Sequence, residues 1–469
     1  MDRKTKIIAT IGPASGTSEM IEALIRGGVN IARLNMSHAA YDVTQTHVRV
    51  IREVSQRLNT AVGILMDIQG PAIRTASLPK DISLSAGDRF AFGVKGAVHP
   101  EVQTVGVNYD GLVDDLELGQ QVIVDNGNIL MEVLEMGDDW VICRVITDGV
   151  LGSRRHINLP GVHVGLPGLT EKDKKDVAFG IELGVDFLAM SFARKATDVA
   201  ELRAIIDSAG GHQQIIAKIE NQQGLTNLDE ILDASDGVMV ARGDLGVECP
   251  YEDIPEIQRA VVRASRAKGK PVIVATHMLE SMMQSPSPTR AEVTDIAVAV
   301  HLRTDAIMLS GETSVGAYPL RCVEVMDRVA RRIERSDEFV MECDPVELTA
   351  RAKLMAAAST LADDLGDDTP IVVFTRSGRM ARNAAWQRPE KSAIYAFTDN
   401  VELFNQLAIL WGVKPFMIEV KESPAENAVK AMEILKEQTL TRTGDTVVFV
   451  SDAEINGRYL KSLQLHIVD

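Results

Sequence analysis

A lysine and a glutamate stand two positions apart at the end of an alternating apolar run, residues 215–221. Residues i and i+2 of a strand share a face, so Lys218 and Glu220 are expected to point the same way. A cation beside a carboxylate that can bind a metal suits chemistry on a phosphorylated, anionic substrate. For a single strand, a structural Lys–Glu pair is the alternative interpretation. Residues 238–244 repeat the pattern, with Asp244 following another buried strand.

Short apolar segments alternate with helical patterns along the chain and must position these side chains. The predicted strands are residues 6–11, 30–35, 62–67, 186–192, 214–220, 237–242, 272–277 and 306–311. Strands that alternate with helices predict right-handed βαβ units and a parallel sheet. This number of units predicts a (β/α)8 TIM barrel, a fold whose active sites lie at the carboxyl ends of the strands.

One connection, from residue 67 to residue 186, is far too long for a single helix. Residues 82–165 instead alternate short β-like runs with turn residues, which predicts a small inserted β-barrel. Gly70-Pro71 and Pro167-Gly168 punctuate its two ends, as hinges would. Because the insertion follows the third strand, we expect it to hang over the active site as a lid that moves as a rigid body.

A further pattern begins near residue 341, where predicted strands at 371–375, 393–398, 415–418 and 446–451 alternate with helices. This pattern indicates a separate open α/β domain. We therefore predict a barrel domain from residues 1–69 and 169–340, a lid domain from 70–168, and a C-terminal domain from 341–469.

Composition restricts the classes of partner. The chain has 49 Lys plus Arg against 66 Asp plus Glu, a net charge of -17, which argues against nucleic acid and against an anionic membrane surface. The sequence contains no apolar run of roughly 18 residues, so no membrane span is predicted. The amino terminus lacks a signal-peptide pattern. The four cysteines lack metal-ligand spacing and are typical of reduced thiols, so a cytoplasmic protein is expected.

Charged side chains recur at the predicted strand ends, where they should line one mouth of the barrel. Arginine forks and a lysine charge suit phosphate, which singles out Arg33, Arg74 and Lys218. Glu220 and Asp244 are hard oxygen ligands for Mg²⁺, to be completed by substrate and water.

Other polar residues at these ends have two interpretations each. Asn35, Ser37 and Asp67 offer oxygens for a monovalent cation, but they could also be turn or helix caps. Gly243 lets a substrate carboxylate approach backbone N–H groups. Arg74 could be a surface charge.

Taken together, motifs along almost the whole chain resemble those of pyruvate kinase, bacterial type. They are Thr10-Ile11-Gly12-Pro13, residues 33–38, Lys218-Ile219-Glu220-Asn221, residues 239–248, Pro288-Thr289-Arg290-Ala291-Glu292, residues 308–313 and Thr375-Arg376-Ser377-Gly378-Arg379. The resemblance implies transfer of a phosphoryl group from phosphoenolpyruvate to ADP in glycolysis, giving pyruvate and ATP, by a homotetramer under allosteric control.

The resemblance also implies roles residue by residue. Lys218 would stabilise the transferring phosphoryl group, Arg33 would contact it, and Thr276 would lie near the enolate carbon that gains a proton. The implied binding sets are Arg33, Gly243, Asp244 and Thr276 for phosphoenolpyruvate; Arg74, Arg155 and His38 for the nucleotide; Glu220 and Asp244 for Mg²⁺ or Mn²⁺; Asn35, Ser37, Asp67 and the Ile68 carbonyl for K⁺; and Thr375, Arg376, Ser377, Gly378 and Arg379 for a phosphorylated effector.

The chain departs from the family pattern at several positions. Gln69 and Ala72 replace a lysine and a glutamate, and Arg155-His156 replaces Lys-Gly at the nucleotide-contacting turn. The loop at residues 452–458 is shortened and acidic, which favours a sugar or nucleotide monophosphate over a bisphosphate as effector.

Two alternative functions are compatible with the same residues. A metal-dependent aldolase or lyase of pyruvate-enolate chemistry would use the same lysine and carboxylates, but its pyruvate production would not require ADP. A catalytically silent, metabolite-sensing homologue would bind ligands without turnover.

Overall fold

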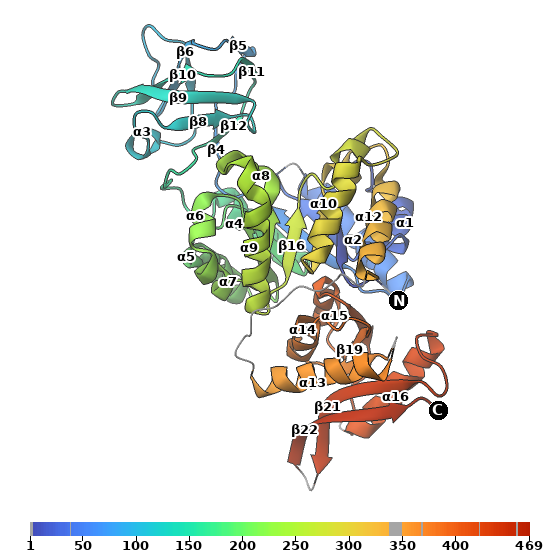
Figure 1. The fold of residues 1–469 in the computed structure, drawn as a ribbon. Helices are drawn as coiled ribbons and strands as arrows, with labels where there is room; N and C mark the ends of the chain where they lie inside the picture. Colours follow the sequence, from blue (N-terminus) through green and yellow to red (C-terminus); the bar gives the residue numbers. More distant parts are fainter. Residues whose placement is uncertain (1–2, 38, 337–348, 367–368, 422, 456–457) are drawn as a thin grey trace.

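The computed structural model describes residues 3–37, 39–336, 349–366, 369–421, 423–455 and 458–469. Figure 1 shows a lid of β-strands above a barrel of strands and helices, with a C-terminal α/β domain beneath the barrel. Among the described residues, no helix combines the length and apolar character needed to span a bilayer.

The barrel is made of eight parallel strands that close on themselves. They are β1 (Lys6–Thr10), β2 (Ile31–Asn35), β3 (Gly63–Ile68), β13 (Phe187–Met190), β14 (Gln214–Ile219), β15 (Gly237–Ala241), β16 (Val272–Ala275) and β17 (Ala306–Leu309). Their order around the barrel is β1-β17-β16-β15-β14-β13-β3-β2. The predicted TIM barrel is confirmed, and each strand overlaps its predicted segment.

Helices surround this barrel. They are α1 (Ser18–Arg26), α2 (Tyr41–Arg57), α4 (Glu171–Glu182), α5 (Ala196–Ser208), α6 (Gln222–Thr226), α7 (Leu228–Ala234), α8 (Arg242–Glu248), η1 (Tyr251–Asp253), α9 (Ile254–Ala267), η2 (Glu280–Met283), α10 (Arg290–His301), α11 (Gly311–Ser314) and α12 (Pro319–Glu334). Capping boxes start two of them, with Thr170 and Asp173 at α4 and Thr289 and Glu292 at α10.

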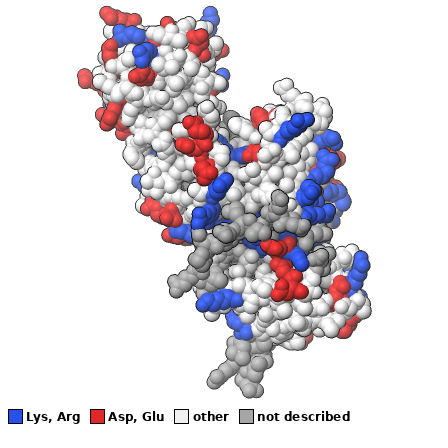
Figure 2. All heavy atoms as spheres, in the orientation of Figure 1, with Lys and Arg blue, Asp and Glu red and all other residues white. Residues whose placement is uncertain are grey.

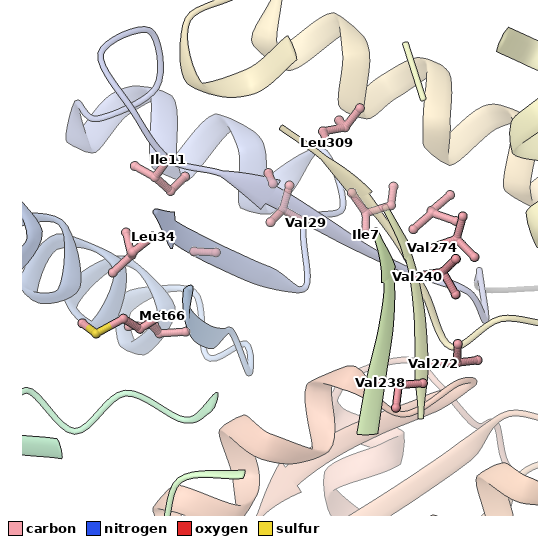
Figure 3. Close-up of a cluster of buried hydrophobic side chains, with 14 of the residues drawn as sticks. Ile7, Ile11, Val29, Leu34, Met66, Val238, Val240, Val272, Val274 and Leu309 are labelled. Atoms are coloured by element: carbon pink, nitrogen blue, oxygen red, sulfur yellow. The ribbon is translucent and has the colours of Figure 1, made fainter. Parts of the chain in front are cut away.

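Barrel residues alternate between two cores because successive strand side chains point to opposite faces. Figure 3 shows outward side chains such as Ile7, Leu34 and Val240, which belong to the core between strands and helices. Inward side chains such as Ile8 and Ile216 belong to a second core that continues into the C-terminal domain. The bottom of the barrel is therefore sealed, and the opposite mouth is left for chemistry.

The lid holds α3 (Leu112–Asp115) and nine strands: β4 (Ile73–Arg74), β5 (Ile82–Leu84), β6 (Arg89–Gly93), β7 (Thr104–Gly106), β8 (Gln121–Val124), β9 (Ile129–Met136), β10 (Trp140–Val145), β11 (Gly149–Leu151) and β12 (His156–Asn158). Seven form one sheet, ordered β4-β12-β8-β9-β10-β6-β7, and β11 pairs with β5. The two sheet edges meet at a bridge between Thr75 and Val107, and the Ala76 N–H donates to the Gly106 carbonyl at 2.7 Å. The sheet thereby curls closed, in agreement with the predicted β-barrel.

The C-terminal domain contains α13 (Ala350–Leu365), β18 (Ile371–Phe374), α14 (Arg379–Trp386), β19 (Ile394–Thr398), α15 (Val401–Gln406), η3 (Leu407–Ile409), β20 (Val413–Met417), α16 (Pro424–Glu437), β21 (Thr446–Ile455) and β22 (Arg458–Ile467). The four predicted strands are present as β18, β19, β20 and β21. They belong to a five-stranded sheet with the order β20-β19-β18-β21-β22. Strand β22 was not predicted, because it pairs antiparallel with β21 and does not continue the alternation of strands and helices.

Buried polar contacts join the barrel to this domain. Asp305, beside the start of β17, accepts two hydrogen bonds from the Arg388 guanidinium, at 2.9 and 2.7 Å, and one from the backbone N–H of Trp411 at 3.2 Å. Lys4, just before β1, donates from Nζ to the Pro389 carbonyl at 2.6 Å. These bonds fix the C-terminal domain against the amino ends of the barrel strands.

The negative charge is spread unevenly over the surface. In the view of Figure 2, acidic side chains are prominent on the lid, whereas basic ones gather along the side of the barrel that carries α1 and α12. The net charge of -17 therefore does not describe every face of the molecule.

Candidate active site

Lys218 and Glu220 meet at the carboxyl end of β14. They follow Ile216, an inward residue, at intervals of two, so both side chains reach the mouth of the barrel. The Lys218 Nζ lies 3.0 Å from Glu220 Oε1, 3.1 Å from Asp67 Oδ1 and 2.7 Å from the Ser191 hydroxyl. The ammonium group is thus held by side chains from three adjacent strands or their ends.

Asp67, at the end of β3, is a counter-ion shared by two cations. Arg33 of β2 donates from Nε to Asp67 Oδ2 at 2.8 Å and from Nη1 to the Thr10 hydroxyl at 3.0 Å. The other oxygen of Asp67 faces Lys218. Asp67 lies within β3, which leads into strand β4 and not into a helix, so the helix-cap interpretation is wrong. With only 2% of the residue exposed, its carboxylate belongs to the buried charge network.

The network alters the pKa values of its members. Burial by itself lowers the pKa of Lys218, but the carboxylates of Asp67 and Glu220 raise it well above the ordinary value. Burial raises the pKa of Asp67, yet Lys218 and Arg33 reverse this and lower it. Burial raises the pKa of Glu220 against the opposing charge of Lys218, and Asp244 and Asp67 raise it further. A divalent cation beside Glu220 would favour its ionised form.

Residues with positive φ shape the loops around these charges. Phe192, after β13, has φ 53°, and its N–H donates to Glu220 Oε2 at 2.6 Å. Thr276, after β16, has φ 72°, which is unusual for a β-branched residue and indicates backbone strain. Its hydroxyl accepts the Gly243 N–H at 2.7 Å.

Sequence reasoning gave no role to two residues that hold these loops. Ser191 accepts from Lys218 and donates to the Ile68 carbonyl, both at 2.7 Å. Arg242 donates to the Thr276 carbonyl at 2.7 Å and pairs with Asp295 at 2.5 Å. The only available signal was their position at the ends of buried strands.

A cavity of about 340 Å³ lies between the barrel mouth and the lid. Most of the predicted site residues line it, namely Arg33, Asn35, Ser37, Asp67, Arg74, Arg155, Lys218, Glu220 and Asp244. Gly243, Thr276 and Ile68 do not line the cavity. Gly243 precedes the lining residue Asp244 and is hydrogen-bonded to Thr276. The Ile68 carbonyl is hydrogen-bonded to the lining residue Ser191. His38 falls outside the described residues.

Two lid arginines form the wall opposite Lys218. Arg155 pairs with Asp125 at 3.1 Å, and Arg74 donates from Nη1 to the Arg154 carbonyl at 3.2 Å. The Nε of Arg74 is buried and has no hydrogen-bond partner within the described part of the chain. An N–H group of this kind is a donor for an anionic ligand, which disfavours the surface-charge interpretation of Arg74.

The acidic groups suit a metal that is completed by its substrate. The described residues contain no group of three or more His, Cys, Asp or Glu side chains that could hold a metal ion. Mg²⁺ commonly takes one or two carboxylates together with phosphate and water oxygens, and Glu220 and Asp244 face the same cavity. These two residues therefore fit Mg²⁺ or Mn²⁺.

The predicted K⁺ ligands are only partly free. Asn35, Ser37 and Asp67 share the cavity, but the Asn35 side-chain oxygen accepts the Ser37 N–H at 3.1 Å. The Ile68 carbonyl is bonded to Ser191. The set fits a monovalent cation if the turn at Ser37 rearranges.

A separate cavity of about 670 Å³ lies in the C-terminal domain. It is lined by Thr375, Arg376, Ser377 and Arg379 of the predicted effector loop. Gly378, with φ 76°, is the N-cap of α14. Sequence reasoning missed three further cations in the lining, Arg351, Lys421 and Lys461.

Comparison with known proteins decides the family. Residues 2–323 match the family described as pyruvate kinase, barrel domain, and residues 352–459 match pyruvate kinase, alpha/beta domain. The chain belongs to the pyruvate kinase family.

Individual pyruvate kinases match over nearly the whole chain. Pyruvate kinase isozyme G, chloroplastic, of Nicotiana tabacum is 41% identical over 96% of this chain and 80% of its own length. The pyruvate kinase of Bacillus licheniformis is 40% identical over 96% of this chain and 78% of its own. The crystal structure of a pyruvate kinase from Cryptosporidium parvum superposes with a TM-score of 0.92 at 35% identity, covering 100% of this chain and 96% of that one.

These matches confirm the resemblance read from the motifs. They favour the phosphotransferase activity of pyruvate kinases over the aldolase, lyase and silent-homologue alternatives. Because chloroplast and bacterial proteins both match, the cytoplasmic location of this chain stays a prediction.

Proposed function

We propose that this chain transfers the phosphoryl group of phosphoenolpyruvate to ADP in the cavity between lid and barrel, giving pyruvate and ATP. The observation that carries the proposal is the pairing of Lys218 with Glu220 at 3.0 Å, facing a cavity whose far wall holds Arg74 and Arg155. Cations on both sides of one cavity suit two phosphorylated substrates, because positioning and charge neutralisation dominate phosphoryl transfer.

On the barrel side, Lys218 would stabilise the transferring phosphoryl group, and Arg33 would contact it. Phosphoenolpyruvate would be held by Arg33 together with Gly243, Asp244 and Thr276, with the threonine hydroxyl near the carbon that is protonated. Glu220 and Asp244 would hold Mg²⁺ or Mn²⁺. When bound, this cation supplies charge neutralisation at the phosphoryl and enolate oxygens.

On the lid side, Arg74 and Arg155 would bind the phosphates of ADP, and His38 is retained in the nucleotide set on the family resemblance alone. The buried Nε of Arg74 supports this assignment, since a phosphate oxygen would supply the acceptor that it lacks. Lid closure would also keep water from the transferring group.

The test is a coupled assay for pyruvate and ATP with and without ADP and Mg²⁺. Pyruvate formation is expected to require both. Pyruvate release without ADP would favour the lyase alternative, and ligand binding without turnover would support the silent homologue.

Activation by K⁺ is part of the proposal. Asn35, Ser37 and Asp67 offer oxygens to one cavity, and Ala72 supplies no internal cation in place of K⁺. Activity should therefore rise when K⁺ is added to a buffer free of K⁺ and NH₄⁺. Equal activity in the two buffers would refute this part.

We further propose that the C-terminal cavity binds a sugar or nucleotide monophosphate in a cytoplasmic homotetramer. Ser377 and the cations Arg376, Arg379 and Lys421 line that cavity. The measurement is activity at subsaturating phosphoenolpyruvate against a panel of phosphates, for the wild type and Ser377→Asp. Strong activation by fructose bisphosphate would overturn the choice of effector, and activation that survives Ser377→Asp unchanged would overturn the site. Light scattering of the purified protein tests the tetramer.

A further inference from the structure

The cleft between lid and barrel contains two cavities. One is the cavity of about 340 Å³ described above, which we call the reaction cavity. The other, of about 150 Å³, is lined by residues such as Pro71, His163 and Leu166 near the ends of the lid, and we call it the hinge-side cavity. Among the described residues, His156 and Phe192 alone line both. These two side chains therefore form the wall between the cavities.

Each side of the wall comes from a different domain. His156 belongs to β12 of the lid, where it pairs with Arg74 and its carbonyl accepts the Asp125 N–H at 2.9 Å. Phe192 belongs to the loop after β13 of the barrel. The rings meet edge to face, with centroids 5.7 Å apart and planes at 64°. The lid thus contacts the barrel through an aromatic pair at the border of the reaction cavity.

The imidazole takes part in this contact as an uncharged ring. Its removal from water lowers the pKa of His156 to about 4; the neighbouring charge of Arg74 acts in the same direction, and the charge of Glu220 opposes it. An uncharged imidazole packs against phenylalanine without the larger cost of burying a charge.

Phe192 connects the wall to the metal-binding carboxylate. Its backbone has φ 53°, a conformation that needs support from its surroundings in a bulky residue. Its N–H donates to Glu220 Oε2 at 2.6 Å, and the preceding residue, Ser191, accepts from Lys218. A shift of the Phe192 ring would therefore disturb the hydrogen bonds that hold Glu220 and Lys218.

We propose that His156 is a positioning residue whose ring, packed on Phe192, seals the reaction cavity and keeps the Phe192 N–H on Glu220. The inference rests on the proposed function and deepens it. It assigns two consequences to one contact: orientation of a metal ligand, and exclusion of water that could enter from the hinge side.

Water that reaches the site would take the place of ADP. Its oxygen would form a P–O bond to the phosphoryl group, the bond from phosphorus to the enolate oxygen would break, and water's protons would pass to the enol product and the phosphate. The products are pyruvate and inorganic phosphate. The ratio of phosphate released to ATP formed therefore reports on the seal.

The experiment compares His156→Ala with His156→Phe, which keeps an aromatic ring. His163→Ala is the matched control, because His163 is an exposed histidine of the same lid that lines only the hinge-side cavity. His156→Ala should raise the Mg²⁺ concentration for half-maximal activity by roughly tenfold and increase the phosphate-to-ATP ratio. His156→Phe should restore both values toward the wild type, and the control should match the wild type.

Several outcomes would overturn the inference. Unchanged Mg²⁺ dependence and phosphate ratio in His156→Ala would do so, as would equal impairment of the Ala and Phe variants. In a double-mutant cycle with Phe192→Leu, strictly additive effects on Mg²⁺ dependence would show that the ring contact is not responsible. A wild type without ADP-dependent pyruvate formation would refute the proposed function and this inference together, whereas an active wild type with indifferent variants refutes the inference alone.

Discussion

At the scale of single residues, the site is a compact charge network. Arg33 and Lys218 supply two cations, and Asp67 and Glu220 face them at hydrogen-bond distance. Within the described part of the chain Asp244 makes no such contact, and it acts on the network through its charge. The network thus has an excess of negative charge next to the cavity, which a divalent cation would offset.

Lys218→Met should lower kcat about 10²-fold or more, which corresponds to about 2.7 kcal/mol, with a smaller change in KM. The reason is that the ammonium group acts mainly on charge that develops in the transition state. Steady-state kinetics of the folded variant is the measurement, with Lys174→Met as control, since the side chain of this α4 lysine is 41% exposed and pairs with Glu171. Near-normal turnover of Lys218→Met would refute the assigned role.

Asp244→Asn should raise the Mg²⁺ or Mn²⁺ concentration needed for activity, because it removes an anionic oxygen from a hard-cation site. Its fold should persist, since Asp244 stands outside the ion pairs of the network. Metal titration of activity tests this, and the exposed Glu252→Gln serves as control on the neighbouring η1. An unaltered titration curve for Asp244→Asn would contradict its place in the metal site.

At the scale of elements, one buried carboxylate anchors both connections of the lid. Asp173 of α4 accepts the Gly70 N–H at 3.0 Å, and its second oxygen accepts the Thr170 N–H at 2.8 Å. Arg194 holds the returning segment, with hydrogen bonds to the carbonyls of Val164, at 3.1 Å, and Leu166, at 2.7 Å. Lid rotation should therefore occur between these fixed ends.

Asp173→Asn should loosen the lid as well as destabilise α4. The amide loses one acceptor oxygen and leaves a buried N–H unpaired, which costs about 1–3 kcal/mol. Hydrogen exchange should show faster exchange at the lid connections. Glu292→Gln is the matched control, because it weakens the other capping box, at α10, without touching the lid. Equal lid protection in the two variants would mean that Asp173 is a helix cap only.

At the scale of the whole molecule, the barrel and C-terminal domain share a core and a buried ion pair. Arg388 and Asp305 are each about 95% buried or more, and the inner core of the barrel continues into the C-terminal domain. The C-terminal cavity and the reaction cavity thus lie in parts of the molecule that are joined through the amino ends of the barrel strands. We expect the two domains to unfold together.

Arg388→Leu should lower the free energy of unfolding by about 3–5 kcal/mol, because it leaves the Asp305 carboxylate buried without its cation. It should also separate the unfolding of the C-terminal domain from that of the barrel, which hydrogen exchange in the two domains would measure. Arg89→Leu breaks an exposed pair with Glu135 and should cost about 1 kcal/mol or less. A single unshifted transition for Arg388→Leu would contradict the coupling.

The barrel and the polar ring at its mouth could be predicted from the sequence alone. The reason is that the hydrophobic period of a strand or helix is set by neighbouring residues, and this period shows which face of the segment is buried. The same period-two rule placed Lys218 beside Glu220. It could not reveal that Asp67 serves Arg33 and Lys218 together, since that depends on the register of three strands.

Only the tertiary structure decided which residues from distant segments meet. The contact of His156 with Phe192, the double role of Asp173 and the closure of the lid sheet through Thr75 and Val107 each join segments separated along the chain. Phe192 has a positive φ, which could not be predicted from its residue type because phenylalanine rarely adopts this conformation. Such contacts follow from strand register and loop conformation, which are set by the packing of the whole fold rather than by neighbouring residues.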